Sequence, residues 1–146
     1  MTIRTMIADD YDRVYDLWLS TPGMGLNTTD DSREGIARYL ARNPNTCFAA
    51  EEDGQLVGVI LSGHDGRRGY IHHLAVASTQ RMRGIGSQLL ERAMEALERE
   101  GIHKAALVVF AKNQTGNAFW EKRGFAARDD LVYRDKHIHA LERIDT

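Results

Sequence analysis

The chain has 146 residues, of which 42% are hydrophobic and 27% charged, with one cysteine and a formal net charge of −2. This length suits a single domain over residues 1–146, and the near balance of 19 basic and 21 acidic side chains does not favour a nucleic-acid partner. The longest apolar run, Ala105–Ala111, is too short to span a bilayer and a lone cysteine forms no internal disulfide, so we expect a cytoplasmic protein without a membrane partner.

The first third of the chain predicts a short strand and two helices. The strand is expected over Thr2–Met6, and Asp9 is expected to cap a helix whose apolar side chains recur at helical spacing. After a glycine-containing loop, Asp31 and Glu34 fit a capping box and predict a second helix. That helix should end just before Pro44, because proline disfavours helical backbone in the residue that precedes it.

The middle of the chain predicts a hairpin, a further strand and a long helix. Two apolar strand candidates, Cys47–Glu51 and Gln55–Ser62, flank an Asp-Gly pair that favours a tight hairpin, so they should be antiparallel. The next strand is expected over Tyr70–Ala77. From Ile85 to Glu100, apolar side chains share one helical face and charged side chains lie largely on the other, which predicts an amphipathic helix.

The last third of the chain predicts a strand over Lys104–Ala111 that is apolar on both faces, as in a central strand covered by helices. A shorter helix is expected over Thr115–Arg123, followed by strands near Phe125–Asp129 and Lys136–Ile144. This order of helices and strands predicts an α/β fold built on a mixed sheet.

The segment Arg81–Ser87 lies between an expected strand and the start of the long helix. The first turn of a helix has unpaired N–H groups and a partial positive charge, and glycines let an anion come close, so this segment suits a phosphate group. A Walker loop is excluded because the chain has no Gly-Lys pair. A dinucleotide fingerprint is excluded because Gly84-Ile85-Gly86 is not followed by a third glycine.

The residues from Arg81 to Gly86 resemble the pyrophosphate loop of the GNAT superfamily of acetyl-CoA-dependent N-acetyltransferases, which reads Arg/Gln-x-x-Gly-x-Gly/Ala after a strand. A second stretch, Asn113–Phe125, is similar to the family's Asn…Ala-Leu-Tyr-Glu-x-x-Gly-Phe element. The resemblance implies a mixed, mostly antiparallel sheet that splays between its fourth and fifth strands, with helices on both faces and acetyl-CoA in the opening. It also implies direct transfer of acetyl to an amine, without an acyl-enzyme.

The resemblance further implies which residues bind acetyl-CoA. Backbone groups at the end of the fourth strand would pair with the pantetheine arm and steady the thioester oxygen: Leu74, Ala75 and Val76. Backbone amides and two arginines would hold the pyrophosphate: Arg81, Met82, Arg83, Gly84, Ile85, Gly86 and Ser87. Four residues of the second stretch would contact the pantetheine arm or line its far end: Asn113, Asn117, Phe119 and Trp120.

Direct transfer requires a base, because an aliphatic amine has a pKa of about 10 and must lose a proton before it attacks. Many relatives carry a tyrosine that protonates the leaving thiolate at the position of Trp120, and an indole cannot supply that proton. Ribosomal-protein N-terminal acetyltransferases carry a catalytic glutamate five residues before the asparagine, and this chain has Val108 there. That subgroup's mechanism therefore cannot operate here.

The candidate bases are His72 and His73, which precede Leu74. Arylalkylamine N-acetyltransferases carry a histidine at the position of His72, two residues before the same Leu-Ala-Val. Adjacent strand residues point to opposite faces, so at most one of the two histidines is expected to face the thioester. Tyr133, on a late loop, is the candidate proton donor.

Other reactive side chains are not expected to form a site. His137 and His139 share one strand face but lack a third ligand, so no metal is expected. Cys47 falls in an expected core strand and is interpreted as a buried, inert thiol.

We expect acetyl-CoA-dependent N-acetylation of a primary amine, with a small molecule favoured over a protein. Met24 and Leu26, in the loop between the first two helices, would favour an acceptor with some apolar surface if exposed. Two alternatives stay open: acetylation of a protein lysine or N-terminus, and a non-catalytic acyl-CoA-binding regulatory module. The second stays open because Trp120 stands where many relatives have the proton-donating tyrosine. The expected partners are acetyl-CoA and the amine acceptor, and a homodimer is left open.

Overall fold

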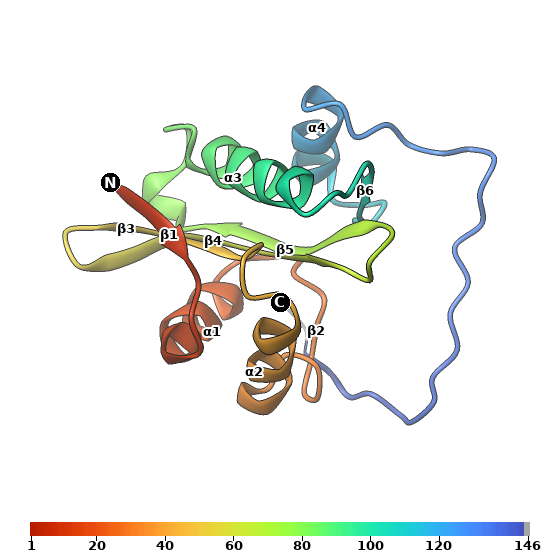
Figure 1. Cartoon of the computed structure of the whole chain (residues 1–146), viewed down its shortest axis with the longest axis horizontal. Helices are drawn as coiled ribbons and strands as arrows, with labels where there is room; N and C mark the ends of the chain where they lie inside the picture. The colour runs from red at the N-terminus through yellow and green to blue at the C-terminus, as the bar shows by residue number, and fades with distance from the viewer. Residues whose placement is uncertain (145–146) are drawn as a thin grey trace.

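The computed structural model describes residues 1–144 of the chain. Its main sheet has five strands in the order β1-β3-β4-β5-β6, and β2 and β7 form a separate two-stranded ladder (Figure 1). Neighbouring strands of the main sheet are antiparallel except β5 and β6, which are parallel. The strands are β1 Thr2–Thr5, β2 Leu26–Asn27, β3 Phe48–Glu52, β4 Gln55–His64, β5 Gly69–Val76, β6 Ala105–Ala106 and β7 Arg143–Ile144.

Helices cover both faces of the sheet, which confirms the predicted fold class. Figure 1 shows α1 and α2 against one face and α3 and α4 against the other. They span Tyr11–Leu19, Arg33–Arg42, Ile85–Arg99 and Gln114–Lys122, with 3₁₀ turns at Ala8–Asp10 and Ser78–Gln80. The long helix α3 matches its prediction, and it can lie close to β4 because a Cβ on Gly58 would be only 2.9 Å from Leu89 Cδ1.

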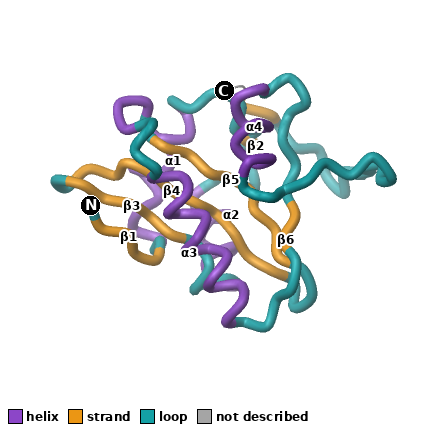
Figure 2. Tube along the Cα trace, turned by 90° about the horizontal axis from the view of Figure 1, so that it is seen from above, coloured by secondary structure: helices purple, strands orange, loops and turns teal. Residues whose placement is uncertain are grey.

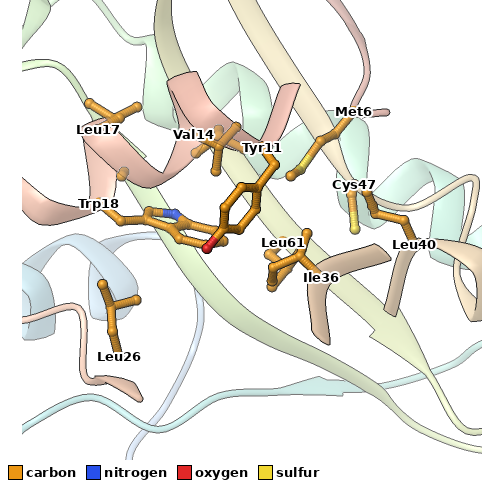
Figure 3. Close-up of a cluster of buried hydrophobic side chains, with 12 residues drawn as sticks. Met6, Tyr11, Val14, Leu17, Trp18, Leu26, Ile36, Leu40, Cys47 and Leu61 are labelled. Atoms are coloured by element: carbon orange, nitrogen blue, oxygen red, sulfur yellow. The ribbon is translucent and has the colours of Figure 1, made fainter. Parts of the chain in front are cut away.

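Two apolar cores lie on the two sides of the sheet. The core beneath α1 and α2 includes Trp18 and Cys47, both fully buried (Figure 3). The core beneath α3 joins Leu89 and its helical neighbours to Ile60 and Ile71 of the sheet. Burying one face of α1, α2 and α3 in this way supplies most of the stabilisation of these helices.

The sheet opens between β5 and β6. The two strands pair only through Gly69 with Ala105 and Tyr70 with Ala106. Beyond that point β5 continues to Val76, and no backbone hydrogen bond joins it to residues 107–111. β5 and β6 are the fourth and fifth strands of the main sheet, so the expected splay between these two strands is present. It leaves one edge of β5 without a neighbouring strand.

A β-bulge in β5 changes the direction of the two histidines. Leu61 pairs with His73 and Ser62 pairs with Ile71, so His72 is an extra residue without a partner on β4. The His72 ring contacts Tyr39 of α2, with centroids 5.3 Å apart, and the His73 ring contacts Trp18 of α1, with centroids 4.9 Å apart. The expectation that the two histidines point to opposite faces was wrong, because a bulge interrupts the alternation of strand side chains.

The expected strands Phe125–Asp129 and Lys136–Ile144 are not formed, apart from the two residues of β7. Instead residues 126–142 form an exposed segment without regular structure, which we call the C-terminal arm (Figure 2). A strand needs a neighbour that accepts and donates its backbone hydrogen bonds, and in the described chain this segment finds one only at β7. Apolar side chains such as Leu131 and Ile138 are exposed, so burial does not hold a sheet there either.

The predicted strand Lys104–Ala111 is likewise reduced to Ala105–Ala106. It lies at the edge of the sheet, where Val108 is 57% exposed, and it is not a covered central strand. The cause is the splay, because the chain leaves β5, its one neighbouring strand within residues 1–144, after two residues.

Both early helix starts differ from their predictions. The cap of α2 is Ser32, whose hydroxyl accepts a hydrogen bond of 3.0 Å from the Gly35 N–H, so Asp31 is free to bond elsewhere. The helix α1 begins at Tyr11 after a 3₁₀ turn, and within that turn Asp10 accepts a hydrogen bond of 2.8 Å from the Ile7 N–H. Neighbouring residues with capping side chains compete for the same role, and only the fold selects one of them.

Candidate functional site

The loop before α3 is shaped by residues in left-handed conformation. Met82 has a φ of 70° and Gly84 has a φ of 77°, and Gly84 is the N-cap of α3. Left-handed residues within such a turn direct successive N–H groups toward one concavity, which is a typical anion-binding arrangement. The residues from Arg81 to Gly84 are exposed, so the first turn of α3 can be reached from solvent.

Three arginines lie around this loop, of which the sequence predicted two. Arg81 is exposed at its start, whereas Arg83 forms a two-pronged ion pair with Glu52 and thereby lowers the pKa of that carboxyl. The third, Arg123 at the end of α4, donates from Nε to Ser87 Oγ over 2.8 Å. Sequence reasoning missed Arg123 because its partner is 36 residues away.

Phe119 and Trp120 of α4 pack beside the first turn of α3. A Cβ on Gly86 would lie 3.3 Å from the Phe119 ring, so glycine at this position allows the two helices to approach. The Trp120 ring is edge-on to Phe119, with centroids 5.0 Å apart, and also contacts Phe125. The two sequence motifs are therefore in contact, because the start of α3 from the first motif packs against α4 from the second.

Asn113 and Asn117 are placed at the start of α4 and have local hydrogen bonds. The Asn113 side chain caps the helix by accepting a hydrogen bond of 2.9 Å from the Gly116 N–H. The Asn117 amide donates to the carbonyls of Phe110 and Asn113, at 3.0 and 2.8 Å. Both side chains thus fix the turn that leads from the splayed segment into α4.

Leu74, Ala75 and Val76 lie on β5 along its open edge. Their backbone groups on that side have no strand partner, which is the condition for an extended ligand to pair with them as an added strand. Gly86 lies next to this edge, since its added Cβ would be 3.6 Å from a methyl carbon of Val76. The open edge and the anion-binding loop are thus continuous.

His72 is exposed but lies among aromatic side chains. Its ring contacts Tyr39 of α2 and Tyr70 of β5, with centroid distances of 5.3 and 4.6 Å. The surrounding protein disfavours the charged imidazolium, and His73 acts in the same direction, so the pKa of His72 is lowered from 6.5. A neutral imidazole in contact with solvent is able to accept a proton near neutral pH.

His73 is 9% exposed and has one hydrogen-bond partner. Its Nε2 lies 2.8 Å from the carboxylate of Asp31, and its Nδ1 is buried without a partner among the described residues. The structure thus separates the two candidate bases, since the proton-accepting atom of a base must be accessible to its substrate. Asp31, which the sequence assigned only to a helix cap, is therefore in direct contact with one of the two candidate bases.

The remaining sequence candidates lie further out or are inert. Tyr133 is 69% exposed on the C-terminal arm. The pKa of Tyr70 is raised chiefly because Tyr70 is partly buried, and the nearby phenol of Tyr133 raises it further. Leu26 is buried in the α1 core, so it is not on an acceptor surface as we had considered. Burial raises the pKa of the Cys47 thiol to about 12.

Residues 1–144 contain no cluster of three or more side chains suited to a metal ion. Within the same residues, no helix has both the length and the apolar composition that a membrane crossing requires.

A strand edge left open beside a glycine-containing helix start, with cations at that start, is the geometry of a protein class that holds an extended ligand ending in an anionic group. The model of the acetyltransferase (GNAT) family matches residues 11–125, and the chain belongs to this family. It is 31% identical over 138 residues to acetyltransferase SG1711 of Sodalis glossinidius, across 94% of this chain and 96% of that protein. It is 33% identical over 145 residues to acetyltransferase plu1384 of Photorhabdus laumondii, across 97% of this chain and 92% of that protein.

Solved structures share the fold at low sequence identity. The PaiA N-acetyltransferase of Thermoplasma acidophilum, in complex with coenzyme A, has a TM-score of 0.75 and 17% identity, with 99% of this chain and 98% of that chain covered. The ribosomal-protein-alanine N-acetyltransferase of Brucella melitensis has a TM-score of 0.68 and 20% identity, with 94% and 100% covered. At such identities the likeness supports the fold alone.

Proposed function

We propose that the protein transfers acetyl from acetyl-CoA to the primary amine of a small molecule, with His72 as the base. The observation that carries the proposal is the position of His72, whose exposed ring lies on β5 two residues before the open edge at Leu74. A proton acceptor at this position would lie next to the backbone that would hold the thioester, which supports the proposal. The role of acetyl-CoA is supported by the continuity of that edge with the loop before α3.

The proposed reaction transfers acetyl directly from the thioester to the amine, without an acyl-enzyme. The acceptor ammonium gives a proton to the His72 imidazole, and the free amine attacks the thioester carbonyl carbon. As the tetrahedral intermediate collapses, the carbon–sulfur bond breaks, the CoA thiolate leaves, and the new amide nitrogen releases its second proton to solvent. An N–H on the open edge of β5 stabilises the oxyanion, and Tyr133 is proposed to give a proton to the thiolate. Tyr133 then takes a proton from solvent and the His72 imidazolium releases one to solvent, which restores both side chains.

The proposal of a small acceptor is supported by the residue at one position, where ribosomal-protein N-terminal acetyltransferases carry a catalytic glutamate. Val108 occupies that position, is exposed and has no group that binds a proton or an ammonium. The base is instead an imidazole bordered by the rings of Tyr39 and Tyr70, which suits an amine that carries some apolar surface. The protein-acetylating and non-catalytic alternatives are separated by the experiment below.

The test is release of CoA thiol from acetyl-CoA in the presence of polyamines, arylalkylamines, amino acids and short peptides. The protein adds no background to a thiol reagent, because Cys47 is buried with its pKa raised to about 12. We expect turnover with a free amine, its loss in His72→Ala, and a smaller loss in Tyr133→Phe. Turnover with peptides alone would favour a protein substrate, and binding of acetyl-CoA without turnover would favour the regulatory module.

A further inference from the structure

Asp31 and His73 form a buried pair between the helical layer and the bulge of β5. Asp31 is 4% exposed and His73 is 9% exposed, and 2.8 Å separates Asp31 Oδ1 from His73 Nε2. The pair is not needed to begin α2, since Ser32 caps that helix. A buried polar pair that secondary structure does not require calls for another explanation.

The neighbours of Asp31 determine where the proton of His73 lies. Asp31 Oδ2 accepts a hydrogen bond of 2.9 Å from the Asn27 N–H. A carboxylate only accepts hydrogen bonds, so Nε2 of His73 must be the protonated nitrogen. The buried Nδ1 then carries a lone pair and no hydrogen. The neighbouring Trp18 indole N–H is itself a buried donor without a partner among the described residues, so an acceptor at Nδ1 is more favourable there than a second N–H.

The pair also fixes the bulge. Asp31 is held to β2 through Asn27, and its carbonyl accepts a hydrogen bond of 2.7 Å from the Tyr11 hydroxyl of α1. His73 is the residue after the extra residue of the bulge, where β5 pairs again with β4. A strong hydrogen bond at this point holds the strand to the helical layer and so sets where His72 lies.

We propose that Asp31 is a positioning residue for the acetyl transfer, which acts by holding His73 with its proton on Nε2 and thereby fixing the bulge that presents His72 at the open edge. The inference rests on the proposed function of His72. It assigns His73 a supporting role, and it assigns the contact with the acceptor to His72 alone.

The substitution Asp31→Asn tests the proton position directly. An asparagine here would place an N–H group against either the Asn27 N–H or the Nε2–H of His73. We expect the side chain to keep its oxygen toward Asn27 and to drive His73 to the tautomer protonated on Nδ1. Nitrogen NMR of the imidazoles reports the tautomer without any acceptor amine, so this readout stands even if the proposed function fails.

The same variant has a second readout at His72. The groups that face His72 are Tyr39 of α2, Tyr70 and His73 of β5, and the carboxylates of Asp30 and Asp31, and both carboxylates raise its pKa. Removing the charge of Asp31 should therefore lower the pKa of His72 further and move the acidic limb of the rate profile to lower pH. We expect kcat to fall by at least about tenfold with KM for acetyl-CoA within about twofold, because the cofactor loop is untouched.

Two further variants complete the test. Asp30→Asn removes the same charge from an exposed neighbour that does not bond His73, and it should leave the His73 tautomer and kcat near the parental values. His73→Gln keeps an N–H donor for Asp31 and should retain most of kcat, whereas His73→Ala should not. Parental tautomer, pH profile and kcat in Asp31→Asn would overturn the proposal, and so would a His73→Gln variant as inactive as His72→Ala. If Asp31→Asn does not fold, the His73→Gln result decides.

Discussion

The Nε of Arg123 donates a hydrogen bond of 2.8 Å to the hydroxyl of Ser87, which joins the end of α4 to the first turn of α3. The guanidinium also lies over the Phe119 ring, 3.9 Å from its centroid. The N-terminus of α3 has a partial positive charge, and Arg123 adds a full one beside it. The proposed pyrophosphate site therefore combines backbone amides of α3 with a cation at the end of α4, a helix that is distant in sequence and adjacent in space.

The substitution Ser87→Asp should separate cofactor binding from folding. Its carboxylate can pair with Arg123 and is favourable at a helix N-terminus, so the melting temperature should hold or rise. The same charge repels a pyrophosphate, and two unit charges about 4 Å apart interact by about 1–4 kcal/mol in surroundings between water and a protein surface. We expect the Kd of acetyl-CoA, measured by calorimetry, to increase by at least about tenfold.

Gln88→Glu is the matched control for Ser87→Asp. It adds the same charge one residue later in α3, at an exposed position. We expect it to change the Kd of acetyl-CoA by less than about threefold at physiological salt. Equal weakening by both variants would mean that the pyrophosphate does not lie at the first turn of α3.

Local patterns in the sequence predicted the parts of this fold that local physics determines. The period of apolar side chains located α3, the Asp-Gly pair located the β3–β4 hairpin, and Arg81–Ser87 located the loop between β5 and α3. Each of these signals lies within one element or one turn. The sequence also placed both histidines on the correct strand.

The misses all depend on contacts between distant segments. The bulge at His72 is defined by the register of β4, and the bond of Asp31 to His73 spans 42 residues. The strands expected after Phe125 have suitable side chains, but whether they form depends on a neighbouring edge that the sequence does not specify. Asp31 and Ser32 are both good caps for α2 by local preference. The sequence could not decide between them, because the fold places only Ser32 at the start of the helix.

The pH profile of the parent and of His72→Ala tests the base. A base must be neutral to accept the proton, so kcat/KM should fall as pH decreases through the pKa of His72. The protein around the partly solvated ring, followed by His73, lowers that pKa, so the midpoint of the acidic limb should lie below about 6.5. His72→Ala should lose both rate and this limb, and an unchanged limb in the variant would assign the titration to another group.

Asp10 is expected to be the most important charged residue for stability near the N-terminus. Its buried carboxylate accepts two hydrogen bonds of 2.8 Å from Arg4 and one of 3.0 Å from Arg13. In Asp10→Asn both arginines keep Glu51 as a partner but lose charge-assisted hydrogen bonds at a buried acceptor, so the free energy of unfolding should fall by about 1–3 kcal/mol. Asp12→Asn is the control, since its 76% exposed carboxylate should cost less than about 1 kcal/mol.

The pH dependence of stability gives the sign of the Asp10 contribution. Burial alone would raise the pKa of Asp10, but the hydrogen bonds from Arg4 and Ile7 outweigh it and the pKa is lowered from 3.8. A carboxyl with a lowered folded-state pKa stabilises the protein above its unfolded pKa, and this contribution is lost as pH falls toward the folded pKa. The difference in unfolding free energy between parent and Asp10→Asn should therefore be constant above about pH 5 and shrink below about pH 4. A difference that grows on acidification would contradict the assignment.

The C-terminal arm should be the first part of the chain that a protease cleaves. Residues 126–142 are all exposed and include trypsin sites at Arg128, Arg134 and Lys136. Exposed backbone without regular structure fits a protease active site, whereas strands and helices do not. Brief trypsin treatment followed by mass spectrometry should give fragments that end within the arm while α3 and the sheet stay intact. The gel-filtration mass should be measured on the same sample, because an arm that resists cleavage in a dimer, and is cut on dilution to the monomer, would show that a second copy covers it.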